Sequence, residues 1–222
     1  MQPAQPAPPA QPAQPAQPAQ PAQPLQAAGP AQPAAQRQPR VNAREERENQ
    51  FNAYLPKVLR TWQVNLMETV FRQNDRKICW FVQEAGGCGK SWFARYLAFV
   101  YGYVILDGVS AAKAARMLKG SKPKGIIFDV TRENSPRFCY STLDRCKNGI
   151  LVSGKYKGCI AEFDVVPVLV LANVFPDRTR LSQDRWEVIV YHGGQDDLDD
   201  LGTRRVKEAF PPRNLWTAQE DE

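Results

Sequence analysis

One stretch of twenty residues, ICWFVQEAGGCGKSWFARYL at positions 78–97, constrains the fold of this chain more than any other. It begins with an apolar run at 78–82, which predicts a buried strand. A turn of small residues follows at 85–89, and Lys90 and Ser91 then open a segment whose apolar residues recur at the spacing of one buried helix face. A strand, a glycine-rich loop and a helix in this order are the context that a phosphate-binding loop needs.

The residue types of this loop suit a polyphosphate. Glycines let the backbone turn its N–H groups inward and remove Cβ atoms that would block a phosphate, and the start of the helix adds its positive dipole end. We therefore predict that Lys90 reaches the β- and γ-phosphates of a nucleotide and that Ser91 holds Mg²⁺. The predicted nucleotide-binding residues are Gly86, Gly87, Cys88, Gly89, Lys90 and Ser91.

The match to the pattern G-x-x-x-x-G-K-[ST] is incomplete, because Glu84 stands at its first position. The alternative interpretation is a glycine-rich turn between a strand and a helix that binds no ligand. The phosphate-binding loop is favoured, because Gly-Lys-Ser at a helix start after an apolar strand is a rare combination by chance. Whether Glu84 weakens nucleotide binding is left open by the sequence.

A second apolar strand ends at Asp129, which predicts a carboxylate beside the Mg²⁺ bound at Ser91. The alternative is an aspartate that only caps a strand end. Many ATPases place a second, water-activating acid after this one, but Val130 follows here. The water-activating base must then come from elsewhere, and the candidates are Glu133 and Glu84.

An amide ends the third apolar strand, which is predicted at 167–172. Asn173 at this position can hold the attacking water or the γ-phosphate. It also begins a turn that contains Pro176, and ordinary turn chemistry explains an asparagine there equally well.

A hairpin is predicted at 150–160, and its tip carries Lys155, Tyr156 and Lys157. Cations beside an aromatic ring can contact phosphates and stack on an unpaired base. A solvated hairpin with no ligand is the alternative.

The charge and the cysteines narrow the class of protein. The formal net charge is +6, with the positive excess between residues 51 and 193 and acidic flanks. This distribution suits the binding of a polyanion such as nucleic acid, and an ordinary solvated surface is the alternative. Five cysteines form no C-x-x-C pair and the one histidine is His192, so we expect reduced thiols in an intracellular protein and no zinc site. No apolar run approaches the length of a membrane span.

Taken together, these residues resemble the superfamily 3 helicase domain of replication-associated (Rep) proteins of small circular single-stranded DNA viruses and related plasmids. The resemblance covers about residues 59–191. Its motifs follow one another in the order RTWQ, DRKICW, GGCGKS, IIFDVTR, GILVSGKYKG, VLVLANVFPD and LSQDRW.

The resemblance implies an α/β P-loop NTPase of the AAA+ type, with a five-stranded parallel sheet flanked by helices. It further implies an ATPase that uses ATP and Mg²⁺, assembles into a homo-oligomeric ring, with a hexamer expected, and moves 3′-to-5′ along single-stranded DNA. The same superfamily serves RNA viruses, so RNA is the alternative substrate. We expect a virus-encoded, intracellular protein in the host nucleus or the cytoplasm. We expect no segment that spans a membrane.

The resemblance also assigns roles residue by residue: Walker A to Lys90 and Ser91, Walker B to Asp129, the motif C amide to Asn173, the pore loop to Lys155 and Lys157, and a charge reaching a neighbour's nucleotide to Arg185. The segment from Asp129 to Arg132 resembles a branch of the family with Asp-x-Pro-Arg, which also lacks the second acid.

The chain departs from the family in one respect. Rep proteins usually carry an N-terminal nicking domain with a His-x-His motif and a nucleophilic tyrosine. The one histidine of this chain is His192, and residues 1–50 are too few and too polar to hold such a domain. No nicking activity is therefore expected. A nucleotide-binding interaction protein that no longer hydrolyses is the alternative function, motivated by Glu84 and the missing second acid.

Composition divides the chain into four parts. Residues 1–40 are a Pro-Ala-Gln repeat, which predicts a disordered arm with polyproline II character. We expect a helical lead-in at 41–74, the helicase and ATPase domain at 75–193, and an acidic, flexible tail at 194–222. Within these parts, helices are expected after Pro56 and at 110–118 and 135–149, with further strands at 103–106 and 186–191.

Overall fold

The structure, a computed structural model, describes residues 43–108, 110–153, 158–193 and 198–212. The predicted arm at 1–40 and the predicted hairpin tip at 154–157 therefore lie outside the described residues.

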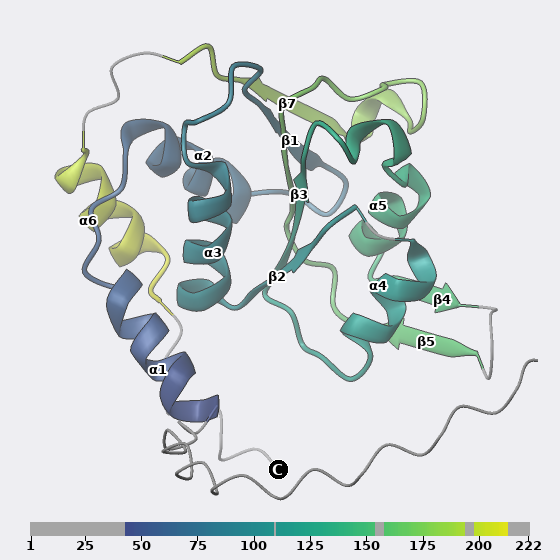
Figure 1. The fold of residues 1–222 in the computed structure, drawn as a ribbon, viewed down its shortest axis with the longest axis horizontal. Coiled ribbons are helices and arrows are strands. Elements are labelled where there is room, and N and C mark those ends of the chain that lie inside the picture. Colours follow the sequence, from purple (N-terminus) through teal and green to yellow (C-terminus); the bar gives the residue numbers. More distant parts are fainter. Residues whose placement is uncertain (1–42, 109, 154–157, 194–197, 213–222) are drawn as a thin grey trace, which may run out of the picture. The chain divides into compact units, whose positions relative to one another are not determined.

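Five parallel strands form the central sheet in the order β2-β3-β6-β1-β7 (Figure 1). Their bounds are Ile78–Val82 (β1), Tyr103–Leu106 (β2), Gly125–Val130 (β3), Val168–Ala172 (β6) and Trp186–Val190 (β7). Strand β1 pairs with the central strand β6 through Trp80 and Val170, and with the edge strand β7 through Trp80 and Val188. The predicted five-stranded parallel sheet is confirmed.

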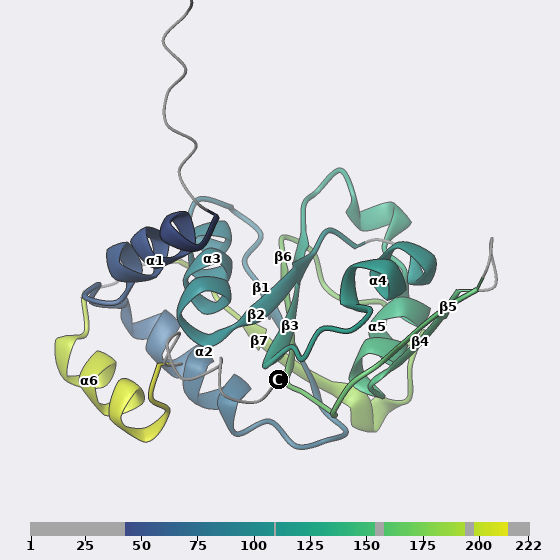
Figure 2. The ribbon, with the colours of Figure 1, turned by 90° about the horizontal axis from the view of Figure 1, so that it is seen from below.

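Helices cover both faces of this sheet (Figures 1 and 2). One face carries helices α2 and α3, with α1 and α6 packed against them; their bounds are Ala43–Tyr54 (α1), Thr61–Phe71 (α2), Lys90–Tyr101 (α3) and Asp200–Ala209 (α6). The other face carries Ala111–Leu118 (α4), Tyr140–Lys147 (α5) and an antiparallel hairpin of Ile150–Ser153 (β4) and Cys159–Glu162 (β5). The predicted hairpin is thus confirmed in its two strands.

The continuous apolar runs of the sequence follow from this two-sided burial. All five residues of β1 are buried, because Cys79 and Phe81 face the α2 and α3 side while Ile78, Trp80 and Val82 face the α4 and α5 side. No helix among the described residues has both the length and the apolar character that crossing a membrane requires.

The helix predicted at 135–149 is wrong in its first half. The structure has a short 3-10 helix at Ser135–Arg137 and then α5 from Tyr140, with Phe138 extended between them. Phe138 is buried, and its ring lies 5.4 Å from that of Trp80, edge to face. Turning this ring into the core interrupts the helix, which the local sequence signals do not reveal.

The expected flexible tail at 194–222 contains a packed helix in its described part. Asp199 caps α6 by accepting a hydrogen bond from the Gly202 N–H (2.7 Å), and the Leu59 N–H donates to the Thr203 hydroxyl (2.9 Å). Val206 is fully buried. The prediction failed because this segment has few apolar residues, and its order comes from a cap and from contacts with a region 144 residues earlier. Residues 194–197 and 213–222 lie outside the described residues.

Candidate nucleotide-binding site

The candidate site lies at the carboxyl edge of the sheet. The P-loop follows β1, Asp129 lies near the end of β3, and Asn173 directly follows β6. Because β6 pairs with β1 on one side and β3 on the other, these three strand ends are neighbours at one edge. This is the edge at which open parallel sheets bind their ligands.

The glycines of the loop form an open backbone cradle. Gly86, Gly87 and Gly89 have φ values of 85°, 81° and 96°, a region that favours glycine over other residues. A Cβ atom added at Gly87 or Gly89 would meet no other atom within 4 Å, so the space beside these two residues is open. Such a cradle fits the phosphate groups of a nucleotide.

Lys90 turns back over this loop. Its Nζ donates to the side-chain Oε1 of Gln83 (3.0 Å) and to the Gln83 carbonyl (3.2 Å), and the residue is 8% exposed. Burial lowers the pKa of Lys90; the positive charge of Arg132 lowers it further, whereas Cys88 and Asp129 act in the opposite direction. The lysine is therefore held at the loop by Gln83, and the charge of Asp129 favours its protonated form.

Gln83 connects the predicted residues, although the sequence analysis did not single it out. Its carbonyl also accepts a hydrogen bond from the Asn173 amide (2.8 Å), and its own amide donates to the Gly86 carbonyl (2.9 Å). The Gln83 N–H donates to Ala172 and so extends the pairing of β1 with β6. The position directly after an apolar strand and before the glycines was a signal that could have identified this residue.

The remaining sequence candidates are placed as follows. Ser91 is exposed at the first turn of α3, and Asp129 is half-buried near the end of β3. Glu84 in the loop and Glu133 after β3 are both exposed, and their role as the water-activating base stays a prediction. The three hairpin residues Lys155, Tyr156 and Lys157 lie outside the described residues.

Arg185 lies at the opposite edge of the sheet, directly before the start of β7. It is 7% exposed, and its guanidinium pairs with the Asp144 carboxylate (3.1 Å) and donates to the side-chain oxygen of Asn148 (2.6 Å). These internal partners tie α5 to the start of β7. The side chain is thus held by partners within the same chain, and the expected role of Arg185 at a neighbour's nucleotide stays a prediction.

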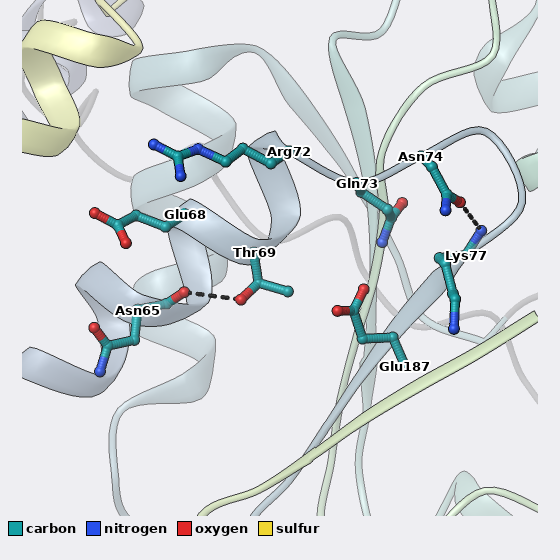
Figure 3. A pocket seen from close by; sticks show the side chains of 8 residues that line it. All are labelled: Asn65, Glu68, Thr69, Arg72, Gln73, Asn74, Lys77 and Glu187. Carbon is teal, nitrogen blue, oxygen red and sulfur yellow. Dashed lines mark hydrogen bonds between the residues drawn. The ribbon is translucent and has the colours of Figure 1, made fainter.

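Two cavities help to locate the site. One of about 210 Å³ adjoins the P-loop; its lining includes Gln83, Gly86, Gly87, Arg60 and Tyr191. Another, of about 510 Å³, lies at the opposite edge between α2 and β7, where Figure 3 shows polar side chains such as Asn65, Gln73 and Glu187. None of the predicted site residues lines this second cavity.

The residues at the P-loop fit ATP and Mg²⁺ chemically. The open glycine backbone and the Lys90 ammonium are donors for phosphate oxygens. The Ser91 hydroxyl and the Asp129 carboxylate are the oxygen ligands that Mg²⁺ prefers.

Comparison with known proteins finds relatives among the Para-Rep proteins of alphasatellites. Para-Rep C3 of Milk vetch dwarf C3 alphasatellite is 33% identical over 134 residues, which is 59% of this chain and 47% of that protein. Para-Rep C6 of Subterranean clover stunt C6 alphasatellite is 34% identical over 134 residues (59% and 47%), and Para-Rep C2 of Subterranean clover stunt C2 alphasatellite is 33% identical over 154 residues (68% and 54%).

These relatives confirm the resemblance predicted from the motifs. The chain spans about half the length of the curated relatives that it matches. No family model matches the chain.

Proposed function

Because this chain is a homologue of the Rep proteins of alphasatellites, we propose that it is an ATP-dependent helicase of viral replication, which hydrolyses ATP to move along single-stranded DNA. The observation that carries the proposal is that Lys90 and Asn173 both donate to Gln83 at the P-loop, with Asp129 near the end of β3, the other strand that pairs with β6. A glycine-rich turn without a ligand needs no such convergence of three strand ends.

Each residue has a distinct task in this proposal. The loop N–H groups and Lys90 bind the phosphates of ATP, and an anionic ligand there favours the protonated lysine against the effect of burial. Ser91 and Asp129 hold Mg²⁺, which when bound neutralises charge that develops on the phosphates. The amide of Asn173 orients the attacking water or the terminal phosphate.

The hairpin supplies the contact with single-stranded DNA in this proposal. Its described part ends at the pair Ser153 and Cys159, so Lys155, Tyr156 and Lys157 belong to the connection between the two strands. In a homo-oligomeric ring each subunit would contribute these cations, which multiplies the contacts with one strand. Neutralising them should reduce the number of counterions released on binding and so flatten its salt dependence.

Phosphate release and unwinding of a tailed duplex test the proposal. The parent protein should hydrolyse ATP faster with single-stranded DNA, and Lys155→Ala/Lys157→Ala should keep the basal rate but lose both the stimulation and strand separation. Lys122→Ala/Lys124→Ala is the matched control, because these two exposed lysines precede β3 at the other edge of the sheet. A double hairpin variant that unwinds like the parent would show that the strand is bound elsewhere.

A nucleotide-binding interaction protein is the second candidate, and one observation favours it. Val130, in the position where many ATPases have a second acid, is 2% exposed and packs in the core, so this position cannot activate water. Tight ATP binding without turnover, with or without DNA, would support this candidate over the helicase. Stimulation by RNA but not by DNA oligonucleotides would instead make RNA the substrate.

A further inference from the structure

Arg132 lies against the start of the P-loop. It comes from the turn after β3, three residues beyond Asp129, and its guanidinium Nη2 donates to the carbonyls of Glu84 and Ala85, the latter at 3.2 Å. A Cβ atom added at Gly86 would lie 3.8 Å from the same Nη2 and 3.7 Å from the Asn173 amide. The side chains of Arg132 and Asn173 therefore flank the first glycine of the cradle.

Arginines in the described part of the chain differ in their partners. Arg132 shares with Arg95, Arg116 and Arg145 a bond to a backbone carbonyl, but its acceptors, Glu84 and Ala85, stand at the start of the P-loop. Arg76, Arg185, Arg204 and Arg205 each form an ion pair with a carboxylate. Among the described residues, no carboxylate pairs with Arg132, which is exposed and bonds to two neutral carbonyls. A guanidinium has five N–H donors, so most of its capacity for binding an anion is unused by these two bonds.

The charge of Arg132 also acts on Lys90, because it lowers the pKa of that lysine. Two cations beside one loop repel each other, and this repulsion disfavours the arrangement unless an anion lies between or beside them. A polyphosphate supplies that anion. A phosphate carries negative charge and can accept two parallel N–H bonds from a guanidinium, whereas a carbonyl is neutral, so phosphate would displace the two carbonyls.

We propose that Arg132 is a phosphate-contacting residue of this site, which exchanges its bonds to the Glu84 and Ala85 carbonyls for bonds to the terminal phosphate of a nucleoside triphosphate. The inference rests on the proposed function, in which the P-loop holds ATP. The terminal phosphate is the target because Arg132 follows the same strand end as Asp129, the predicted Mg²⁺ ligand, and lies beside Asn173.

A different role for Arg132 would be to fix the loop start, where Glu84 replaces the usual glycine. The two roles predict different nucleotide affinities. A residue that only fixes the loop supports the whole cradle, so its loss weakens the binding of ATP and ADP alike. A residue that contacts the terminal phosphate supports ATP and leaves ADP almost unaffected.

Calorimetric titration of the full chain with Mg²⁺ and either ADP or a non-hydrolysable ATP analogue distinguishes these roles. For Arg132→Ala we expect the affinity for the ATP analogue to fall by about tenfold or more, from the loss of a charge-assisted bond, and that for ADP by less than about threefold. Arg132→Lys should recover part of the lost affinity. Arg137→Ala is the matched control, since Arg137 is an exposed arginine on the 3-10 helix of the same connection.

Equal losses for the two nucleotides, or no loss for either, would overturn the inference while leaving the proposed function intact. A folded parent protein that binds neither nucleotide would overturn both. Thermal unfolding of each variant identifies any general loss of folding, and Arg132→Gln provides a second neutral variant with a longer side chain if the alanine variant does not fold.

Discussion

Two buried lysines at opposite edges of the same sheet have nearly the same partners. The Nζ of Lys90 donates to the side chain of Gln83 (3.0 Å) and to a backbone carbonyl (3.2 Å). The Nζ of Lys147, at the end of α5, donates to the side chain of Gln73 (2.9 Å) and to the Val166 carbonyl (3.3 Å). Burial lowers the pKa of both lysines. A buried lysine with a glutamine partner therefore does not by itself mark a ligand site.

The surroundings of the two lysines differ. Gln73, visible in Figure 3, also accepts from the Val168 N–H (2.7 Å) and donates to its carbonyl (3.0 Å), so this side chain continues the hydrogen bonding of β6 where β1 has not yet begun. Lys147 is 1% exposed and is buried beside Gln73. At the other edge, Lys90 directly follows a glycine loop in which Gly87 and Gly89 have open space beside them. A cavity does not distinguish the two lysines, because Gln73 lines the one of about 510 Å³; the open glycine backbone that precedes Lys90 does.

The largest expected effect separates the two lysines by function. Lys90→Ala should reduce ATP turnover by about 100-fold or more, because it removes a charged donor aimed at the transferred phosphate. Its unfolding free energy should change little, because Gln83 keeps its bonds to Gly86 and Asn173. Phosphate release and chemical denaturation measure the two quantities. Parental turnover in this variant would contradict the P-loop assignment.

The reverse result is expected at the other edge. Lys147→Ala should lower the unfolding free energy by roughly 2–4 kcal/mol, because it empties a fully buried position and removes a donor from Gln73. Turnover per folded molecule should stay at the parental level. Lys147→Met is the control, because it keeps the buried stem without the ammonium, and it should lie within about 1–2 kcal/mol of the parent. An ATPase defect without a stability defect would break the comparison.

The sequence could predict the P-loop edge because its signals are local. Lys90 and Ser91 stand in one contiguous motif, and Asp129 and Asn173 each end an apolar strand, so parallel pairing alone brings them together. Lys147 carries no such signal. It ends a short helix with mostly polar residues, and only the packing of that helix against the sheet buries it.

The sequence also could not predict the contacts of Arg132 or the packed helix α6, because neither has a local signal. Arg132 reaches carbonyls 47 and 48 residues earlier in the chain, and α6 is fixed by bonds to residues near Leu59. These contacts depend on the relative placement of elements far apart in the chain. Hydrophobic periodicity predicts the elements themselves and not the polar bonds between them.

An intermediate effect is expected for the two glutamines. Gln73→Ala should destabilise the protein by roughly 1–3 kcal/mol, because Val168 and Lys147 lose their hydrogen-bond partner in a buried corner. Gln83→Ala should instead act mainly on nucleotide affinity, since it frees the Lys90 amine and the Gly86 carbonyl inside the loop. Urea denaturation and nucleotide titration of both variants sharpen the comparison. Equal stability losses with unchanged affinities would remove the distinction between the edges.

The smallest expected effect is a pH dependence of stability at the Lys147 edge. Burial lowers the pKa of Lys147 to about 8 from 10.5; Arg185 adds to the shift and Asp75 opposes it. Between these two values the unfolded chain binds a proton that the folded chain has released, so unfolding becomes less favourable as pH rises. Below about pH 8 both states are protonated, and the cost of burying the charge is constant. The difference in unfolding free energy between Lys147→Met and the parent should therefore be largest below pH 8 and shrink by about 1–2 kcal/mol toward pH 9. Urea denaturation at several pH values measures it, and parallel curves for the two proteins would show that Lys147 does not titrate in this range.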